Sequence, residues 1–167
     1  MDFPYRISIQ KEERIMIWIT ILYIVFIFSN SAKPGVISAS DSNWVTDLLN
    51  RWMRDWGLAY IQFSEGFIRK FAHFAEYSVL GVMLTLSLAK YPFFQGKRRW
   101  LLVPLGLCIA AIDEGIQYFT PGRDCNPMDV LLDTVGVICG VTFCTVVSWL
   151  RNKWKQKKAG KQIRQIG

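Results

Sequence analysis

Six carboxylates and the single histidine of this chain lie inside or at the edge of segments that are apolar enough to cross a membrane. They fall in three short stretches: RKFAHFAEY at 69–77, DEGIQYFTPGRD at 113–124 and DVLLD at 129–133. A carboxylate at such a depth costs about 2.5–3.5 kcal/mol on insertion scales. A chain that carries several is expected to gather them into one internal polar cluster, and we predict that this cluster is the functional site.

The residue types of these stretches suit proton transfer and phosphate binding. His73 can exchange a proton near neutral pH, and Glu76 follows at a spacing that lets it orient the ring. Asp113 and Glu114 are candidates for a general base. These four residues are the predicted catalytic set, and arginine and lysine nearby can hold phosphate. The predicted substrate-binding residues are Arg69, Lys70, Tyr77, Gln117, Arg123, Asp129 and Asp133.

The same carboxylates suit a metal ion. Mg²⁺ prefers oxygen ligands, and a divalent cation of this kind is one candidate cofactor. Zn²⁺ fits the sequence less well, since the stretches supply one histidine and no nearby cysteine. The sequence leaves the metal undetermined.

Transmembrane helices are expected to position the cluster. The chain has 167 residues, of which 51% are hydrophobic, and the apolar residues form blocks. A span needs about 20 mainly apolar residues. We predict spans at 15–29, 71–89, 100–120 and 130–150. Together they predict an all-α integral membrane four-helix bundle, in which Gly136 and Gly140 allow close helix contact.

The first of these segments has a competing interpretation. Basic residues precede its apolar core, and Ser29-Asn30-Ser31-Ala32 follows it, which is typical of a cleavable signal peptide. Its bulky aromatic composition and the Lys33-Pro34 pair that comes next favour a retained span.

Charge predicts the orientation of the spans. The net charge is +7, and the segment from Arg151 to Arg164 holds seven basic residues and no acid. A basic run that directly follows an apolar span is typical of a cytoplasmic anchor on anionic lipid, so we expect membrane lipids and no nucleic acid as partners. Basic residues at 97–99 and before the first span agree. We therefore predict that residues 1–14 and 151–167 are cytoplasmic.

Helical rise then places the acids of three spans at one depth. At about 1.5 Å per residue, Glu76 lies about 9 Å below Lys70, and Asp133 lies about 6 Å below Asp129. Asp113 lies about 10 Å below the end of its own span. The three stretches are thus expected to meet in the outer third of the bilayer, with Arg123 in a tight turn above them.

The loop before the second span also has helical periodicity. Apolar residues from Val45 to Tyr60 recur at helical spacing, with Asp41 or Ser42 as the expected N-cap. Trp44, Trp52 and Trp56 suit the headgroup region. We predict an amphipathic helix on the outer leaflet, which is either an interfacial anchor or a lid over the cluster.

The polar pattern resembles the VanZ family, small bacterial membrane proteins named for a member linked to low-level teicoplanin resistance. The resemblance rests on K-x-x-H-F-x-E-Y, on D-E-x-x-Q, and on a P-G-R turn followed by aspartate, over about 70–140. Arg69 departs from it, where relatives often have an acid, as does Asp133, where they often have asparagine. The resemblance implies a VanZ-like domain at 15–150 in a multi-pass protein of a bacterial cell membrane.

Three classes of function are compatible with these residues. The first is a membrane protein that acts on or binds an envelope lipid, a lipid-linked precursor or a glycopeptide, with a possible role in glycopeptide resistance. The second is a structural or partner-binding protein, in which basic and acidic residues of the cluster only neutralise one another. The third is a small proton- or ion-coupled transporter. The sequence leaves both catalysis and the oligomeric state open.

Overall fold

Helices make up nearly all of the described chain. The computed structural model describes residues 3–123 and 125–163, with side chains for 14–123 and 125–158. The helices are α1 (Phe3–Ser31), α2 (Gly35–Asp55), α3 (Glu65–Leu88), α4 (Leu102–Tyr118) and α5 (Pro127–Ile163). Two short 3-10 helices, Pro92–Phe94 and Gly96–Leu101, join α3 to α4. These residues contain no strand, so the predicted all-α class is confirmed.

Four helical stretches are long and apolar enough to cross a membrane. They are Arg14–Ser31, Glu65–Leu88, Gly96–Tyr118 and Pro127–Lys158. Each overlaps one predicted span, and α5 continues well beyond the predicted end at Leu150. The chain therefore has the helices of a multi-pass membrane protein.

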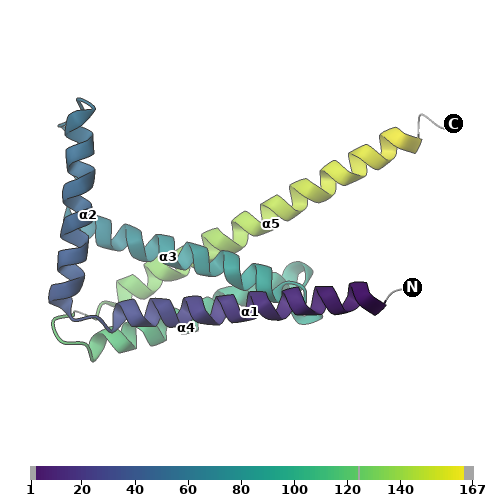
Figure 1. Cartoon of the computed structure of the whole chain (residues 1–167), viewed down its shortest axis with the longest axis horizontal. Helices are drawn as coiled ribbons and strands as arrows, with labels where there is room; N and C mark the ends of the chain where they lie inside the picture. The colour runs from purple at the N-terminus through teal and green to yellow at the C-terminus, as the bar shows by residue number, and fades with distance from the viewer. Residues whose placement is uncertain (1–2, 124, 164–167) are drawn as a thin grey trace.

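The two ends of the described chain lie at the same end of the bundle (Figure 1). The connection from α3 to α4 lies there as well, whereas α2 and the connection from α4 to α5 lie at the opposite end, which we call the α2 end. An even number of spans requires this arrangement. The cytoplasmic location of the termini stays a prediction, and residues 1, 2, 124 and 164–167 lie outside the described part.

Glycines bring α3 and α5 into close contact. A Cβ added at Gly140 would lie 2.2 Å from the carbonyl oxygen of Ser78, and one at Gly136 would lie 2.6 Å from that of Phe74. From the other side, a Cβ at Gly81 would lie 2.5 Å from the carbonyl oxygen of Val137. Side chains larger than hydrogen would force the helices apart, so the predicted packing role of Gly136 and Gly140 is confirmed.

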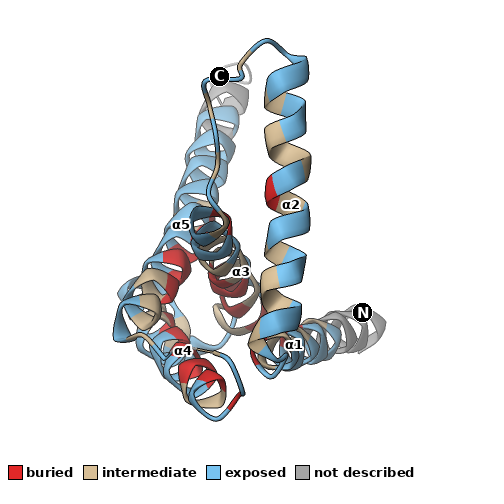
Figure 2. Ribbon diagram, turned by 90° about the vertical axis from the view of Figure 1, so that its left-hand side faces the viewer, coloured by how far each residue is buried: buried red, intermediate tan, exposed pale blue. Residues whose placement is uncertain are grey.

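The apolar core lies where α1, α3, α4 and α5 meet. Figure 2 shows the buried residues gathered between α3, α4 and α5, while α2 is mostly exposed. Ile27 of α1 is buried in this core, and Ser31 at the end of α1 is buried as well. Retention of the first span stays a prediction.

The helix of the loop has different bounds from those predicted. We expected it to start at Asp41 or Ser42 and to reach Tyr60, but α2 runs from Gly35 to Asp55 without a side-chain N-cap. Helix α2 begins directly after Pro34, and its first residue, Gly35, donates its N–H to the carbonyl of Pro121. It ends because Gly57 adopts φ +75° and the N–H of Leu58 bonds the carbonyl of Met53, as in a Schellman motif.

The orientation of α2 fits its predicted role. It runs across the direction of α1 and α3 (Figure 1), as a helix lying along a membrane surface would. Trp44, Trp52 and Trp56 are all exposed in the structure, where headgroups can contact them. Contact with the outer leaflet stays a prediction.

Candidate functional site

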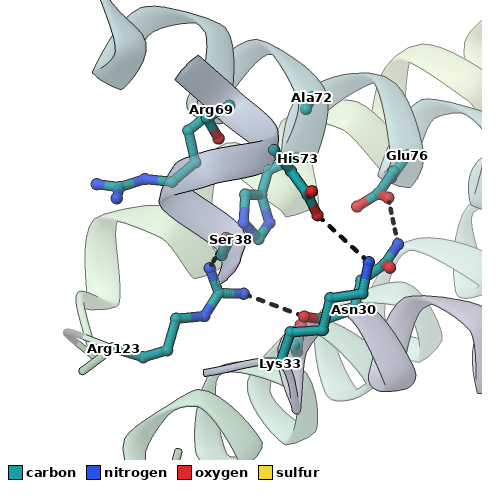
Figure 3. A pocket seen from close by; sticks show the side chains of 11 residues that line it. Asn30, Lys33, Ser38, Arg69, Ala72, His73, Glu76 and Arg123 are labelled. Carbon is teal, nitrogen blue, oxygen red and sulfur yellow. Dashed lines mark hydrogen bonds and ion pairs between the residues drawn. The ribbon is translucent and has the colours of Figure 1, made fainter. Parts of the chain in front are cut away.

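A polar pocket opens at the α2 end of the bundle, between α1, α2, α3 and the turn after α4. Its volume is about 220 Å³. Figure 3 shows its side chains converging from these four segments. The lining residues are Asn30, Ser31, Lys33, Ser38, Asp41, Ser42, Arg69, Ala72, His73, Glu76 and Arg123.

The turn after α4 is fixed so that Arg123 reaches this pocket. Gly122 has φ +74°, which a glycine adopts without strain. A Cβ at Gly35 would lie 1.8 Å from the carbonyl oxygen of Gly122, so the turn and the start of α2 touch through their backbones. Arg123 Nη1 then donates to Ser38 Oγ at 2.6 Å, and its Nη2 donates to the carbonyl of Asn30 at 3.5 Å.

Two guanidinium groups line the pocket without a carboxylate partner. Among the described residues, ion pairs within 4.0 Å join only Lys33 to Asp41, at 3.5 Å, and His73 to Asp133. Arg69 and Arg123 form none. Burial lowers the pKa of Arg123, and the positive charge of Arg69 nearby lowers it further. The predicted alternative, a network in which these cations neutralise the acids by direct pairing, is therefore absent from the described residues.

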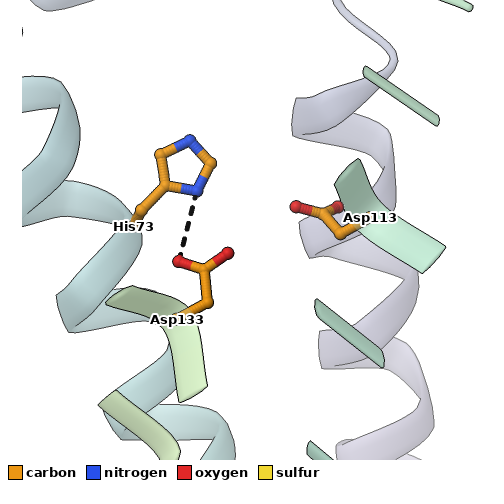
Figure 4. Close-up of side chains that lie close together, drawn as sticks. All are labelled: His73, Asp113 and Asp133. Carbon is orange, nitrogen blue, oxygen red and sulfur yellow. Dashed lines mark ion pairs between the residues drawn. The ribbon is translucent and has the colours of Figure 1, made fainter. Parts of the chain in front are cut away.

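Behind the pocket lie two buried carboxylates. Asp113 on α4 and Asp133 on α5 are each only 1% exposed. His73 of α3 lines the pocket and places its Nδ1 atom 3.7 Å from Asp133 Oδ1, as Figure 4 shows. Gln117 Nε2 donates to Asp113 Oδ2 at 3.3 Å. The three predicted stretches thus meet at His73.

Glu76 faces the same pocket and is held by α1. Its Oε1 accepts a hydrogen bond from Asn30 Nδ2 at 3.1 Å, and the Tyr23 hydroxyl donates to its backbone carbonyl at 3.1 Å. Asn30, rather than His73, is therefore the partner that orients this carboxylate.

Two predicted site residues lie elsewhere. Glu114 is buried, but its Oε1 accepts a hydrogen bond from the backbone N–H of Asn126, so it anchors the connection to α5. The turn of the helix between neighbouring residues points Asp113 inward and Glu114 toward this connection. Lys70 is exposed and lines a separate, mainly apolar groove with Leu131 and Val135. Both are outside the pocket lining.

The remaining predicted residues border the cluster. Asp129 lines a small recess next to the pocket, together with Arg69, Gln117 and Arg123. Tyr77 is fully buried and lies close enough to Asp113 and Asp133 to interact with their charges. Asp124 lies outside the described residues.

The sequence analysis missed the contribution of α1 and α2. Asn30, Ser31, Lys33 and Ser38 line the pocket, yet no functional role was predicted for them. A signal was present, because the polar residues after the first span fall at the same end as the other acidic stretches. Asn30 and Ser31 had instead been assigned to a possible signal-peptide cleavage region.

The fold and site define a multi-pass helical membrane protein with a polar pocket at one end of the bundle. The VanZ/LLP1 family model matches residues 16–148. The chain belongs to this family, as the resemblance of its polar stretches indicated. A search of curated proteins and a search of solved structures found no match.

Proposed function

We propose that the polar pocket binds the phosphate-bearing headgroup of a cell-envelope lipid or lipid-linked precursor at the outer face of a bacterial cell membrane. The observation that carries this proposal is the pair of guanidinium groups, Arg69 and Arg123, that face one pocket without a carboxylate partner. Two like charges in one pocket repel each other, and a bound anion would replace this repulsion with charge-assisted hydrogen bonds.

The ligand class follows from the position of the pocket. It opens at the α2 end of the bundle, beside the first turns of α2, where lipid headgroups would lie if α2 rests on the membrane surface. The arginines are suited to phosphate because the guanidinium can form two parallel hydrogen bonds. The ligand that fits best is therefore a phosphate joined to a lipid chain that stays in the bilayer.

The experiment is equilibrium binding of a short-chain polyprenyl monophosphate to the purified full-length chain in nanodiscs. We expect measurable binding to the phosphate and at least tenfold weaker binding to the matching polyprenol, which lacks the charge. Arg69→Gln and Arg123→Gln should each weaken phosphate binding by about tenfold or more, because each removes charge-assisted hydrogen bonds worth about 1.5–3 kcal/mol.

The matched control is Lys70→Gln. It removes one positive charge from the residue next to Arg69, but on the groove side of α3. We expect it to change the affinity by less than threefold. Equal losses in all three variants would mean that the phosphate responds only to overall charge, and the pocket would then not be the binding site.

Turnover of the bound lipid is a second candidate. It is favoured by His73, which lines the pocket 3.7 Å from the buried Asp133 and can exchange a proton near neutral pH. Formation of a product from radiolabelled lipid precursor, lost in His73→Ala, would support catalysis. Binding without product would support a binding protein.

A role in glycopeptide resistance is part of this proposal and rests on membership of the family. Expression of the chain in a susceptible bacterium should raise the inhibitory concentration of teicoplanin, and Arg123→Gln should remove this gain while the protein level stays normal. Resistance that Arg123→Gln leaves intact would separate this role from the pocket.

A further inference from the structure

Three side chains from three different helices converge behind the polar pocket. His73 comes from α3, Asp113 from α4 and Asp133 from α5, and one ligand atom of each lies within 4.8 Å of the other two. Figure 4 shows the two carboxylates and the imidazole facing a common space. The convergence requires the close α3–α5 contact at Gly136, one turn below Asp133 on α5.

The atoms that face this space lack hydrogen bonds. Among the described residues, His73 Nδ1, Asp113 Oδ1 and Asp133 Oδ1 are buried and have no hydrogen-bond partner. Both aspartates are 1% exposed, so water reaches them poorly. Buried carboxylate oxygens without a partner are strongly unfavourable, and two of them close together are more so.

We propose that His73, Asp113 and Asp133 form a binding site for one divalent transition-metal ion of the Zn²⁺ type. A dication would balance the charge of two carboxylates and would give a ligand bond to each atom that lacks a hydrogen bond. Two ligand atoms bound at about 2.1 Å in a tetrahedral site lie about 3.4 Å apart. The three ligand atoms now lie within 4.8 Å of one another, so the side chains would close by up to about 1.4 Å around the ion.

The ligand set decides the class of metal. Mg²⁺ prefers oxygen ligands alone, whereas imidazole suits Zn²⁺ and other first-row transition metals. The sequence alone made Zn²⁺ a poor candidate because histidine is scarce. The structure changes this expectation, because the one histidine lies with two acids, and three protein ligands with an open position are typical of a catalytic zinc site.

The open position would face the polar pocket. His73 lines that pocket, whereas Asp113 and Asp133 lie behind it. A phosphate oxygen or a water molecule could therefore approach the ion from the side of Arg69 and Arg123. This link to the headgroup rests on the proposed function, but the metal site itself does not.

The experiment is a titration of purified, tag-free, full-length protein with ZnCl₂, MnCl₂ and MgCl₂ after removal of bound metal by a chelator. We expect one Zn²⁺ per chain, no displacement by millimolar Mg²⁺, and affinities at least about 100-fold weaker in Asp113→Asn and Asp133→Asn. Asp129→Asn is the matched control, since it removes a carboxylate one turn away on α5, and it should bind Zn²⁺ like the wild type.

Thermal unfolding distinguishes metal binding from a purely structural role of the two aspartates. Without metal, the two asparagine variants should melt at or above the wild-type temperature, because neutralisation relieves buried charge. With Zn²⁺ at about 100 times the dissociation constant, the wild type should gain about 5–10 °C and these variants should gain none. If the asparagine variants fail to fold, the partly exposed His73→Ser serves in their place.

The outcomes separate the two proposals. Absence of Zn²⁺ binding, a preference for Mg²⁺, or equal affinity in wild type and Asp133→Asn would overturn the metal site. Phosphate binding by the metal-free protein would still support the proposed function. Zn²⁺ binding without phosphate binding would support the metal site alone.

Discussion

Helices α3 and α5 pack closely through glycines in one half of their contact and carry polar side chains in the other half. Around Gly81 and Gly140 the backbones touch, and apolar side chains such as Val137 and Val141 fill the remaining space. About two turns toward the α2 end, the same helices carry His73 and Asp133, whose facing atoms lack hydrogen-bond partners among the described residues. The close contact fixes the distance between the two helices. That distance in turn keeps the polar side chains apart.

The residues of the glycine-lined contact stabilise the fold, whereas the polar residues at the α2 end are positioned by it. A rigid, glycine-lined contact keeps the polar side chains in place although their own interactions are weak. Changes in the glycine-lined half are therefore expected to affect folding, whereas changes at the α2 end are expected to affect binding.

The orientation of the two halves gives an all-or-none prediction. Reporter fusions after Arg99 and after Lys158 should be cytoplasmic, and a fusion near Ser40 should be external, because basic residues flank the cytoplasmic ends of spans. A fusion after Lys158 that reports an external location would place the pocket at the inner face of the membrane.

The glycine-lined half should be intolerant of any added side chain. Gly140→Ala should lower the free energy of unfolding by about 3 kcal/mol or more, because its Cβ would meet the backbone of Ser78. Gly115→Ala is the control: its Cβ would meet nothing within 4 Å on α4, so it should stabilise the helix slightly. Similar melting temperatures for both variants would contradict the rigid contact.

The α2 end should respond to charge without a loss of stability. Glu76→Gln keeps an oxygen that can accept from Asn30 but removes a negative charge from the pocket. We expect the affinity for a polyprenyl phosphate to rise by about two- to fivefold, since the anion no longer faces a like charge, with no change in melting temperature. A fall in affinity would mean that Glu76 contacts the ligand or that the pocket does not hold the phosphate.

The smallest effect is expected at Gly57, just after the C-terminus of helix α2. Gly57→Ala should cost about 1 kcal/mol, because φ +75° is unfavourable for alanine although its Cβ would meet no atom within 4 Å. Hydrogen exchange of the amides that close the helix, Gly57 and Leu58, should be faster. Gly66→Ala on α3 is the control and should leave this exchange unchanged. Unchanged exchange in Gly57→Ala would contradict the Schellman end of α2.

Much of the fold was predictable because it depends on local patterns. Long apolar blocks predicted the four spans, and helical rise placed the acids of 69–77, 113–124 and 129–133 at one end of the bundle. The small residues at Gly136 and Gly140 indicated where two helices would touch. These features depend on hydrophobicity and spacing, which a sequence contains directly.

The features that the sequence did not predict depend on contacts between distant segments. The start of α2 is fixed by the backbone contact of Gly35 with the turn at Pro121 and Gly122, which no local pattern near Gly35 indicates. Asp113 and Glu114 are neighbours of the same chemical type, and only the rotation of α4 decides which one faces the cluster. The roles of Asn30 and Ser38 likewise appear only when α1 and α2 meet α3.

The most direct test of the central proposal is a structure of the full-length chain in nanodiscs with a saturating concentration of polyprenyl monophosphate. We expect the phosphate between the guanidinium groups of Arg69 and Arg123, within hydrogen-bonding distance of both, with the lipid chain leaving the pocket toward the bilayer. A phosphate bound at the opposite end of the bundle, or an empty pocket at saturating ligand, would contradict the proposal.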